Sequence, residues 1–299
     1  MQLSLRAVAW VLSAETVAVL ISALLILDMR AHAAVEQADG PNTWGFRGTA
    51  RLKAVGGARI AVVGGSAAYG YGVGWSQSFP YYLERALNQM WRTAYPHSYT
   101  EVINLAAVGD GAASYITTLR DYAYLKPDVV CIYDGYAGLG VTGAQGARHA
   151  SVVFTKIGYL PILGDVLARR PPWASPERAV VDPLLRDGAV GEVSCDAGSR
   201  GVCSAIIETV VWAIGRGIAV AVVTPPYVSA RHEAQQASLA ALLAARFQGD
   251  RGVHYINMGR QIDVRDRAQS PDGIHLTARG NQTLSENLVD AMFDVLSSR

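Results

Sequence analysis

The stretch that most constrains the fold is residues 59–72, RIAVVGGSAAYGYG. An apolar, largely β-branched run at 60–63 meets a glycine pair, and Ser66 follows at once. Such a run predicts a buried strand that ends in a tight turn, with Gly64 and Gly65 adopting backbone angles that a Cβ would forbid. Ser66 is then displayed at the carboxyl end of the strand, where open α/β sheets bind ligands. A nucleophile, a phosphate contact and a helix cap are the roles open to it.

Apolar runs alternate with segments of helical periodicity along the rest of the chain. Further strands are predicted at 101–105, 128–133, 218–223 and 253–257. Helices are predicted at 79–92, 114–125, 204–216, 232–247 and 277–296. Strands separated by helices predict an α/β fold with a parallel, doubly wound sheet. A length of 299 residues favours one large domain with appendages.

The chain divides into three parts. Residues 1–33 form an N-terminal anchor, 34–58 an extended lead-in, and 59–299 the main domain. Within that domain, residues 137–200 are too long for an ordinary connection. Their densely apolar part, 151–167, leaves four interpretations open: a lid, a patch on the membrane, a partner surface, or a helical excursion packed on its own core.

The anchor is predicted from residues 7–27, which are apolar apart from a few polar side chains. A helix of this length spans roughly 30 Å of hydrocarbon, and the apolar run is longer than the core of a cleavable signal peptide. We expect an uncleaved single-pass helix, although Ala-His-Ala at 31–33 also fits a cleavage pattern. Glu15 lies inside the run, either as a tolerated, protonated carboxyl or in contact with another membrane helix.

The cysteines indicate the cellular compartment of the protein, and its charge indicates which partners to expect. Cys195 and Cys203 bracket a short polar loop, and a disulfide between them would stabilise the fold by roughly 2–3 kcal/mol; two free thiols are the alternative. Cys131 falls in an apolar strand and is predicted to be buried. The disulfide favours an exported, periplasm-like location. With 26 basic and 25 acidic residues and no basic block, nucleic acid is not an expected partner.

A serine nucleophile needs a base, and the base needs an orienting group. His275 lies in SPDGIH, after the last predicted strand and before the final helix, with Asp272 three residues earlier. Both follow a strand at the same edge of the sheet as Ser66. The sequence therefore predicts Ser66 as nucleophile, His275 as base and Asp272 as its partner. The other histidines are expected to be solvated or satisfied side chains: His32, His97, His149, His232 and His254.

Together these motifs resemble the SGNH (GDSL-like) hydrolases. The resemblance is carried, in order and spacing, by GGSAAYG at the first turn, Gly109 in INLAAVGDG, DVVCIYDG at 128–135 and SPDGIH, with TWGFRG and TPPY as lesser features. It covers residues 40–296 and fits 137–200 poorly. It implies a three-layer, flavodoxin-like sheet of five parallel strands. It also implies an oxyanion hole formed by the backbone N–H groups of Ser66 and Gly109.

The chain departs from the family pattern at one position. The family's fourth signature residue is an asparagine two places after the glycine of its third block, and here Gly135 is followed at that distance by Ala137. Loss of one oxyanion donor typically costs about 10²–10³ in rate. A donor from elsewhere, Tyr136 or an asparagine on another loop, is the compensation we consider.

Other chemistries find little support in the sequence. The glycine-rich stretch lacks the Gly-Lys-Ser/Thr ending of a phosphate loop, and no histidine or cysteine spacing indicates zinc. We expect no cofactor and no metal. The favoured function is a membrane-anchored, exported serine ester hydrolase acting on acyl or acetyl esters of a lipid or glycan. Two alternatives stay open: a weak or inactive accessory subunit of a membrane protein complex, and a glycan O-acyltransferase.

Overall fold

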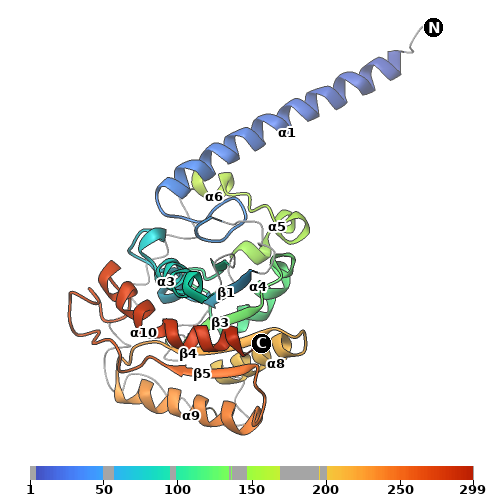
Figure 1. The fold of residues 1–299 in the computed structure, drawn as a ribbon. Helices are drawn as coiled ribbons and strands as arrows, with labels where there is room; N and C mark the ends of the chain where they lie inside the picture. Colours follow the sequence, from blue (N-terminus) through green and yellow to red (C-terminus); the bar gives the residue numbers. More distant parts are fainter. Residues whose placement is uncertain are drawn as a thin grey trace.

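The computed structural model describes residues 5–49, 57–94, 99–134, 136, 147–168, 195 and 201–298. Within them lies one five-stranded sheet of order β2-β1-β3-β4-β5, and every neighbouring pair is parallel. The strands are β1 (Ala58–Gly64), β2 (Thr100–Asn104), β3 (Val129–Tyr133), β4 (Ala219–Thr224) and β5 (Val253–Asn257). The predicted α/β fold with a five-stranded parallel sheet is confirmed (Figure 1).

Of the five helices predicted in the main domain, four agree with the structure to within about two residues. The α-helices are α1 (Leu5–Gln37), α2 (Ser66–Tyr69), α3 (Phe79–Ala94), α4 (Tyr115–Asp121), α5 (Val152–Ile157), α6 (Leu163–Leu167), α8 (Val202–Ile214), α9 (Ala230–Arg246) and α10 (Ala278–Ser297). The exception is the helix predicted at 114–125, which is the short α4 flanked by the 3₁₀ turns η2 (Ala112–Ser114) and η3 (Ala123–Leu125). Its β-branched and aromatic side chains have low helix propensity, which favours this break.

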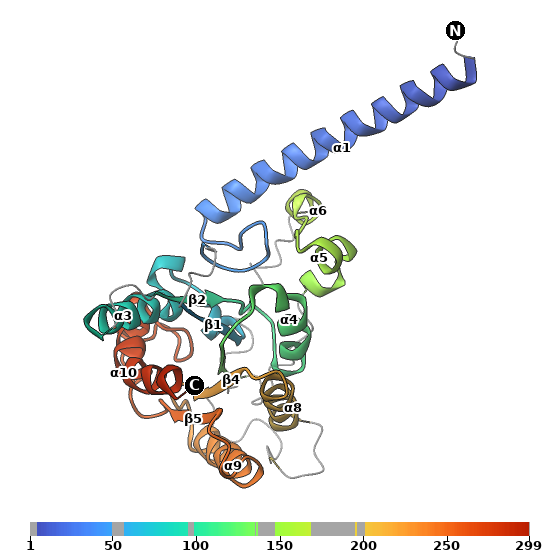
Figure 2. The ribbon, with the colours of Figure 1, turned by 45° about the vertical axis from the view of Figure 1, so that its right-hand side comes forward.

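Helices cover both faces of the sheet because successive strand residues point to opposite sides. In β1, Ile60 and Val62 pack into one core with leucines of α3 and α10. Ala61 and Val63 pack into the other core, against α4, α8 and α9. Figure 2 shows α3 and α10 on one side of the strands and α4 and α8 on the other. The carboxyl edge of the sheet is left to the loops.

Helix α1 leaves the domain as a long arm (Figure 1). In the described part of the chain, it is the one helix long and apolar enough to cross a membrane. Its apolar side chains are exposed as far as Leu27, whereas Asp28, His32 and Val35 are buried against the domain. The helix continues to Gln37, four residues beyond the anchor boundary drawn from the sequence.

The cysteines lie as follows. Cys195 and Cys203 are joined by a disulfide. Cys131 is fully buried in β3, and burial raises the pKa of its thiol to about 12. Of the long segment 137–200, the structure describes 147–168 and Cys195. Ala137 lies outside the described residues.

The glycine at the end of β1 yields a stability prediction. A Cβ on Gly64 would lie 2.4 Å from the Tyr133 carbonyl oxygen and 2.5 Å from the Ala68 Cβ. Gly64→Ala should therefore lower the free energy of unfolding by about 1–3 kcal/mol, measured by urea denaturation. The matched control is Gly164→Ala, where a Cβ meets nothing within 4 Å. Equal stability of the two variants would contradict the close approach.

Candidate active site

The turn after β1 places Ser66 at the first position of α2. Neither Gly64 nor Gly65 has a positive φ, so the predicted reason for the glycine pair is wrong. Glycine is needed because other backbone lies too close: a Cβ on Gly65 would lie 2.9 Å from the Asp110 carbonyl oxygen. The pair lets β3 and the loop after β2 close around the serine.

Ser66, His275 and Asp272 form a continuous hydrogen-bonded chain. Ser66 Oγ lies 2.8 Å from His275 Nε2, and His275 Nδ1 lies 2.7 Å from Asp272 Oδ2. Ser66 and His275 are buried, whereas the Asp272 side chain is 35% exposed. The ring of Tyr71 lies 5.0 Å from that of His275, centroid to centroid. The structure thus brings the three predicted residues together in the predicted order.

The charge on Asp272 fixes the tautomer of His275. Burial by itself raises the pKa of Asp272, but hydrogen bonds from the His275 ring and from backbone N–H groups outweigh it and lower the pKa to about 2. The ionised carboxylate is an acceptor only, so His275 Nδ1 must donate to it. In the neutral ring, Nε2 is then the acceptor for the Ser66 hydroxyl. This is the arrangement that a general base requires.

The loop that carries the histidine is stiffened by its own hydrogen bonds. Asp272 Oδ1 accepts from the N–H groups of Ile274 and His275, at 3.0 and 2.8 Å. Ser270 Oγ donates to the His275 carbonyl at 2.8 Å. The N-cap of α10 is Thr277, whose side chain accepts from Gly280 N. Asp272 is therefore not the helix cap, and its carboxylate is committed to His275.

A buried arginine from the lead-in holds the serine turn from behind. Arg47 Nη1 donates to the carbonyls of Tyr69 and Gly70, both at 2.7 Å, and Nη2 donates to that of Val73. Its guanidinium also lies over the Tyr69 ring, 4.4 Å from the centroid. These contacts give the TWGFRG motif a physical role: it fixes the chain that follows Ser66.

The loop after β2 brings Gly109 to the same edge. Ala107 N donates to the Gly64 carbonyl at 3.3 Å, which attaches this loop to the end of β1. Gly109 has φ +83°, and a Cβ there would meet nothing within 4 Å. Its backbone thus faces open space beside the serine turn. This left-handed conformation, rather than steric crowding, is what favours glycine here.

Tyr136, the replacement oxyanion donor named from the sequence, is engaged elsewhere, and so is Asn104 at the end of β2. The Tyr136 hydroxyl donates to the Pro226 carbonyl at 2.9 Å. The Asn104 amide donates to the carbonyls of Ala68 and Tyr69, each at 3.2 Å. Neither amide nor phenol points its proton at the serine. The described residues therefore leave the backbone groups of Ser66 and Gly109 as the oxyanion donors to consider.

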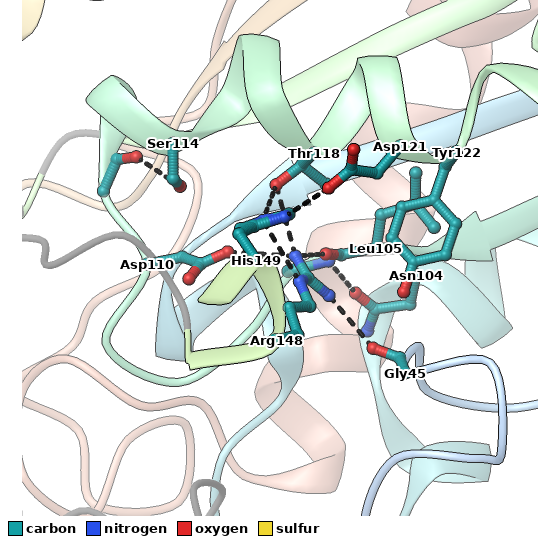
Figure 3. Close-up of polar contacts among 12 residues, drawn as sticks. Gly45, Asn104, Leu105, Asp110, Ser114, Thr118, Asp121, Tyr122, Arg148 and His149 are labelled. Carbon is teal, nitrogen blue, oxygen red and sulfur yellow. Dashed lines mark hydrogen bonds and ion pairs between the residues drawn. The ribbon is translucent and has the colours of Figure 1, made fainter. Parts of the chain in front are cut away.

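A second buried arginine holds the Gly109 loop (Figure 3). Arg148 comes from the 3₁₀ turn η5 (Ala147–Ala150), inside the long excursion. Its Nη2 donates to Asp110 Oδ2 at 2.9 Å and to the Leu105 carbonyl at 2.7 Å, and its Nη1 donates to the Gly45 carbonyl at 3.0 Å. Burial raises the pKa of Asp110, and the Arg148 charge opposes that rise. Arg148 thus ties the loop after β2 to the lead-in.

The neighbouring His149 repeats the hydroxyl–imidazole–carboxylate pattern. Its Nε2 lies 2.9 Å from Thr118 Oγ1, and its Nδ1 lies 2.7 Å from Asp121 Oδ2. Burial and the adjacent Arg148 charge lower the pKa of His149. Thr118 is 1% exposed, so a substrate cannot reach its hydroxyl. This chain is structural: it presents a neutral imidazole to Arg148.

The sequence did not point to this cluster. Arg148 is 38 residues from Asp110, in the part of the chain that fits the family pattern least, and no local motif marks the pair. His149, His32 and His232 are predicted to be solvated or satisfied. All three are bonded: His149 through both ring nitrogens, His32 to the Leu160 carbonyl oxygen and His232 to Val228 N. Burial lowers the pKa of His232 to about 4.

Few other features of the described chain are arranged to hold a ligand. No group of three or more His, Cys, Asp or Glu side chains among the described residues is placed to bind a metal. Asp272 and Gly273 border a groove whose lining does not include Ser66 or His275. Its walls carry the arginines Arg260, Arg265 and Arg267, with Glu233 and Asp263. It is a polar surface beside the histidine loop.

Breaking the buried pair at Arg148 should destabilise the protein. Arg148→Met leaves the Asp110 carboxylate buried without its cation, which typically costs about 3–5 kcal/mol of unfolding free energy. Arg148→Met with Asp110→Leu should recover part of the loss. The matched control is Arg260→Met, whose partner Glu233 is exposed, and it should change stability little in the same urea titration. Equal losses for the buried and exposed pairs would refute this account.

The lowered pKa of Asp272 predicts an acid-sensitive term in stability. Its usual value is 3.8, so the carboxyl of the unfolded chain takes up a proton at higher pH than that of the folded chain. The contribution is present above about pH 4 and is lost as the pH falls toward 2. Unfolding free energy should therefore fall more steeply over this window in the wild type than in Asp272→Asn. Parallel curves would show that the His275 contact does not hold the carboxylate.

Comparison with known proteins matched no family model and no curated protein. Solved structures do match. A two-domain esterase active on acetylated mannans aligns at 13% identity and TM-score 0.45, over 79% of this chain and 49% of its own length. The psychrotrophic esterase EstA from Pseudoalteromonas sp. aligns at 14% and 0.45, over 80% and 98%.

A variant of an acetylxylan esterase from Geobacillus stearothermophilus aligns at 11% identity and TM-score 0.48, over 82% of this chain and 96% of its own. The chain therefore spans about half of the first of these neighbours and nearly all of the other two. Identities and scores this low leave the chemistry to be argued from the residues themselves.

Proposed function

We propose that this protein is a membrane-anchored, exported serine hydrolase of carboxylic esters. The observation that carries the proposal is the hydrogen-bonded chain from Ser66 Oγ through His275 to Asp272. Ser66 and the pair Asp272–His275, which lie more than 200 residues apart, meet at the carboxyl edge of the sheet, and the low pKa of Asp272 keeps that carboxyl ionised. The structural chain Thr118–His149–Asp121 has the same alignment but begins at a hydroxyl on α4. What supports a catalytic role for Ser66 is its position at the turn after β1, at the carboxyl edge of the sheet.

The geometry gives each residue one task. Ser66 Oγ attacks the ester carbonyl while His275 Nε2 takes its proton. The Asp272 carboxylate stabilises the imidazolium that forms and keeps Nδ1 protonated. His275 then returns the proton to the departing alcohol, which leaves an acyl group on Ser66. A water molecule, deprotonated by His275, hydrolyses that ester and regenerates the serine.

The oxyanion of each tetrahedral intermediate would be held by the backbone N–H groups of Ser66 and Gly109. The sequence places Ala137 where the family's asparagine donor is expected. Tyr136 and Asn104 have committed their donors to carbonyl groups. We therefore infer a slow hydrolase, about 10²–10³ below the rate of one with a full set of donors.

Acyl or acetyl esters of a lipid or glycan are the substrate class we propose. The acyl–Ser66 intermediate is open to a sugar hydroxyl as well as to water, so O-acyl transfer to a glycan uses the same residues. A specific observation favours a second role. Glu15 is exposed on the apolar part of α1, where a carboxyl is costly unless another membrane helix covers it. If this chain is an accessory subunit of a membrane protein complex, another subunit of the complex would provide that helix.

The uncleaved anchor is supported by the contacts of the last turns of α1. Asp28 Oδ1 accepts from the N–H groups of Ile162 and Leu163, at 2.9 and 2.6 Å. His32 Nε2 lies 2.6 Å from the Leu160 carbonyl oxygen. Cleavage after residue 33 would remove both side chains and leave buried backbone groups unpaired. The exported side is favoured for the domain because the Cys195–Cys203 disulfide persists in an oxidising compartment.

The nucleophile is tested by labelling with a fluorophosphonate probe. The wild type should be labelled on Ser66, and Ser66→Ala should lose both labelling and roughly 10⁴–10⁶ of the ester turnover. Ser297→Ala, an exposed serine bonded to its own helix, should leave both intact. Absence of labelling and turnover in a folded wild type would reject the hydrolase and favour the accessory subunit.

The anchor is tested on the protein isolated from membranes. Its intact mass should include residues 28–33, and alkaline carbonate should leave it in the membrane pellet. A soluble protein whose sequence starts at Ala34 would contradict the proposal.

Asp28→Ala removes the acceptor of the Ile162 and Leu163 N–H groups. The variant should show faster amide hydrogen exchange at these two residues than the wild type.

A further inference from the structure

We propose that helices α5 and α6 form a second membrane contact, lying in the interfacial layer of the bilayer that α1 crosses. The contact surface, here called the α5–α6 face, consists of the exposed apolar side chains Val152, Val153, Ile157, Val166 and Leu167. The inference rests on the proposed membrane anchoring and adds a defined lipid-facing surface to it.

The apolar side chains of this segment divide into two sets. Phe154, Leu160 and Ile162 are buried in the core beside α4 and α8 and hold the segment to the domain. Val152, Ile157 and Leu167 point outward and are 72%, 68% and 75% exposed. The excursion is therefore packed on the core through one side, while its other side presents large apolar groups to the surroundings. Such a surface marks a protein or membrane contact when it is contiguous.

The height of this surface relative to α1 is set by Asp28. Leu27 ends the uninterrupted exposed apolar run of α1; the buried Asp28 follows it directly, and Met29 after it is exposed. Asp28 Oδ1 accepts from the N–H of Leu163, the first residue of α6, and Asp28 Oδ2 accepts from the Tyr159 hydroxyl. The α6 helix thus begins at the level where the apolar length of α1 ends. In a bilayer spanned by α1, that level is the boundary of hydrocarbon and headgroups.

Both ribbon views place the two short helices beside the domain end of α1. Figures 1 and 2 show α6 next to the last turns of α1 and α5 next to α6, on the side of the domain from which α1 leaves. The α5–α6 face therefore belongs to helices that lie next to the domain end of α1. A lipid surface is the occupant that this position selects, because the bilayer reaches the level of Asp28 wherever α1 is inserted.

Aromatic and charged residues surround the face, among them one exposed carboxylate, Asp165 on α6. Trp44 and Tyr124 are about half exposed, and a Cβ on Gly158, at the end of α5, would lie 3.8 Å from both of them. Tryptophan and tyrosine concentrate at the level of the headgroups. Arg30 on α1 and Lys156 on α5 are exposed and provide positive charge toward anionic lipids. A short amphipathic segment with these flanks lies in the plane of the interface.

Two membrane contacts, α1 and the α5–α6 face, would fix the orientation of the domain. Held by α1 alone, the domain would be free to tilt against the membrane surface. Ser151 caps α5, three residues after Arg148, which bonds to Asp110 in the loop of Gly109. The α5–α6 face is thus joined through the short turn η5 to the loop that carries Gly109. A domain held in this way keeps its candidate active site at a fixed height above the lipid.

The test is a depth measurement on the full chain in vesicles of phosphatidylcholine and phosphatidylglycerol. Nitroxide labels are placed on Ile157→Cys, Leu167→Cys, Leu20→Cys in α1 and Gln282→Cys, an exposed site on α10. Cys131 is buried, and Cys195 and Cys203 are bonded to each other, so none of them competes for the label. Accessibility to oxygen, which partitions into lipid, is compared with that to a water-soluble nickel complex.

Labels at 157 and 167 should favour oxygen, as at 20, whereas the label at 282 should favour nickel. Nickel accessibility at 157 and 167 equal to that at 282, with 20 in lipid, would overturn the membrane contact and leave the anchor intact. Exclusion of both reagents from 157 and 167 would show a protein cover, such as a second copy, and would also overturn it. Label 20 in water would overturn the anchor and the contact together.

Discussion

The hydrogen bond between Ser66 Oγ and His275 Nε2 joins residues 209 positions apart, and the rest of the structure maintains that distance. It forms because all strands of the sheet are parallel, so the turn after β1 and the loop after β5 meet at one edge. Close approach at Gly64 brings β3 against the serine turn, and the bonds within the Asp272 loop fix the imidazole. The motifs supply the three side chains, but their meeting at one place depends on the parallel order of the strands.

Two buried arginines extend this arrangement beyond the sheet. Arg47, from the lead-in, fixes the chain after Ser66, and Arg148, from the excursion, fixes the loop of Gly109. Arg47 donates to backbone carbonyls, whereas Arg148 donates to two carbonyls and to side chains that include Asp110, so each guanidinium joins several segments of the chain. Segments that appear to be appendages in the sequence are in this way part of the frame of the site. The same excursion carries the α5–α6 face toward α1.

Much of this was predictable because it depends on local patterns. The strands follow from short apolar runs, and Ser66, Asp272 and His275 follow from motifs of a few residues each. The Arg148–Asp110 pair and the contacts of Asp28 were not predictable, since they depend on where distant segments pack. The position of the turn at Gly64 and Gly65 was predicted correctly, but the reason given for glycine there was wrong. Glycine is required because other segments pack close to both residues, which is a tertiary effect. The helix predicted at 114–125 is shortened to α4 because its residues have weak helix propensity, and tertiary packing then decides where the helix ends.

The central claim is that Asp272 holds a neutral His275 with its proton on Nδ1 and its acceptor toward Ser66. Proton and nitrogen NMR of the protein labelled with ¹⁵N-histidine observes this directly. The account predicts a far-downfield proton coupled to Nδ1 of His275, protected from exchange with water and lost in Asp272→Asn. A His275 protonated on Nε2, or an Nδ1 proton that exchanges freely with solvent, would contradict it.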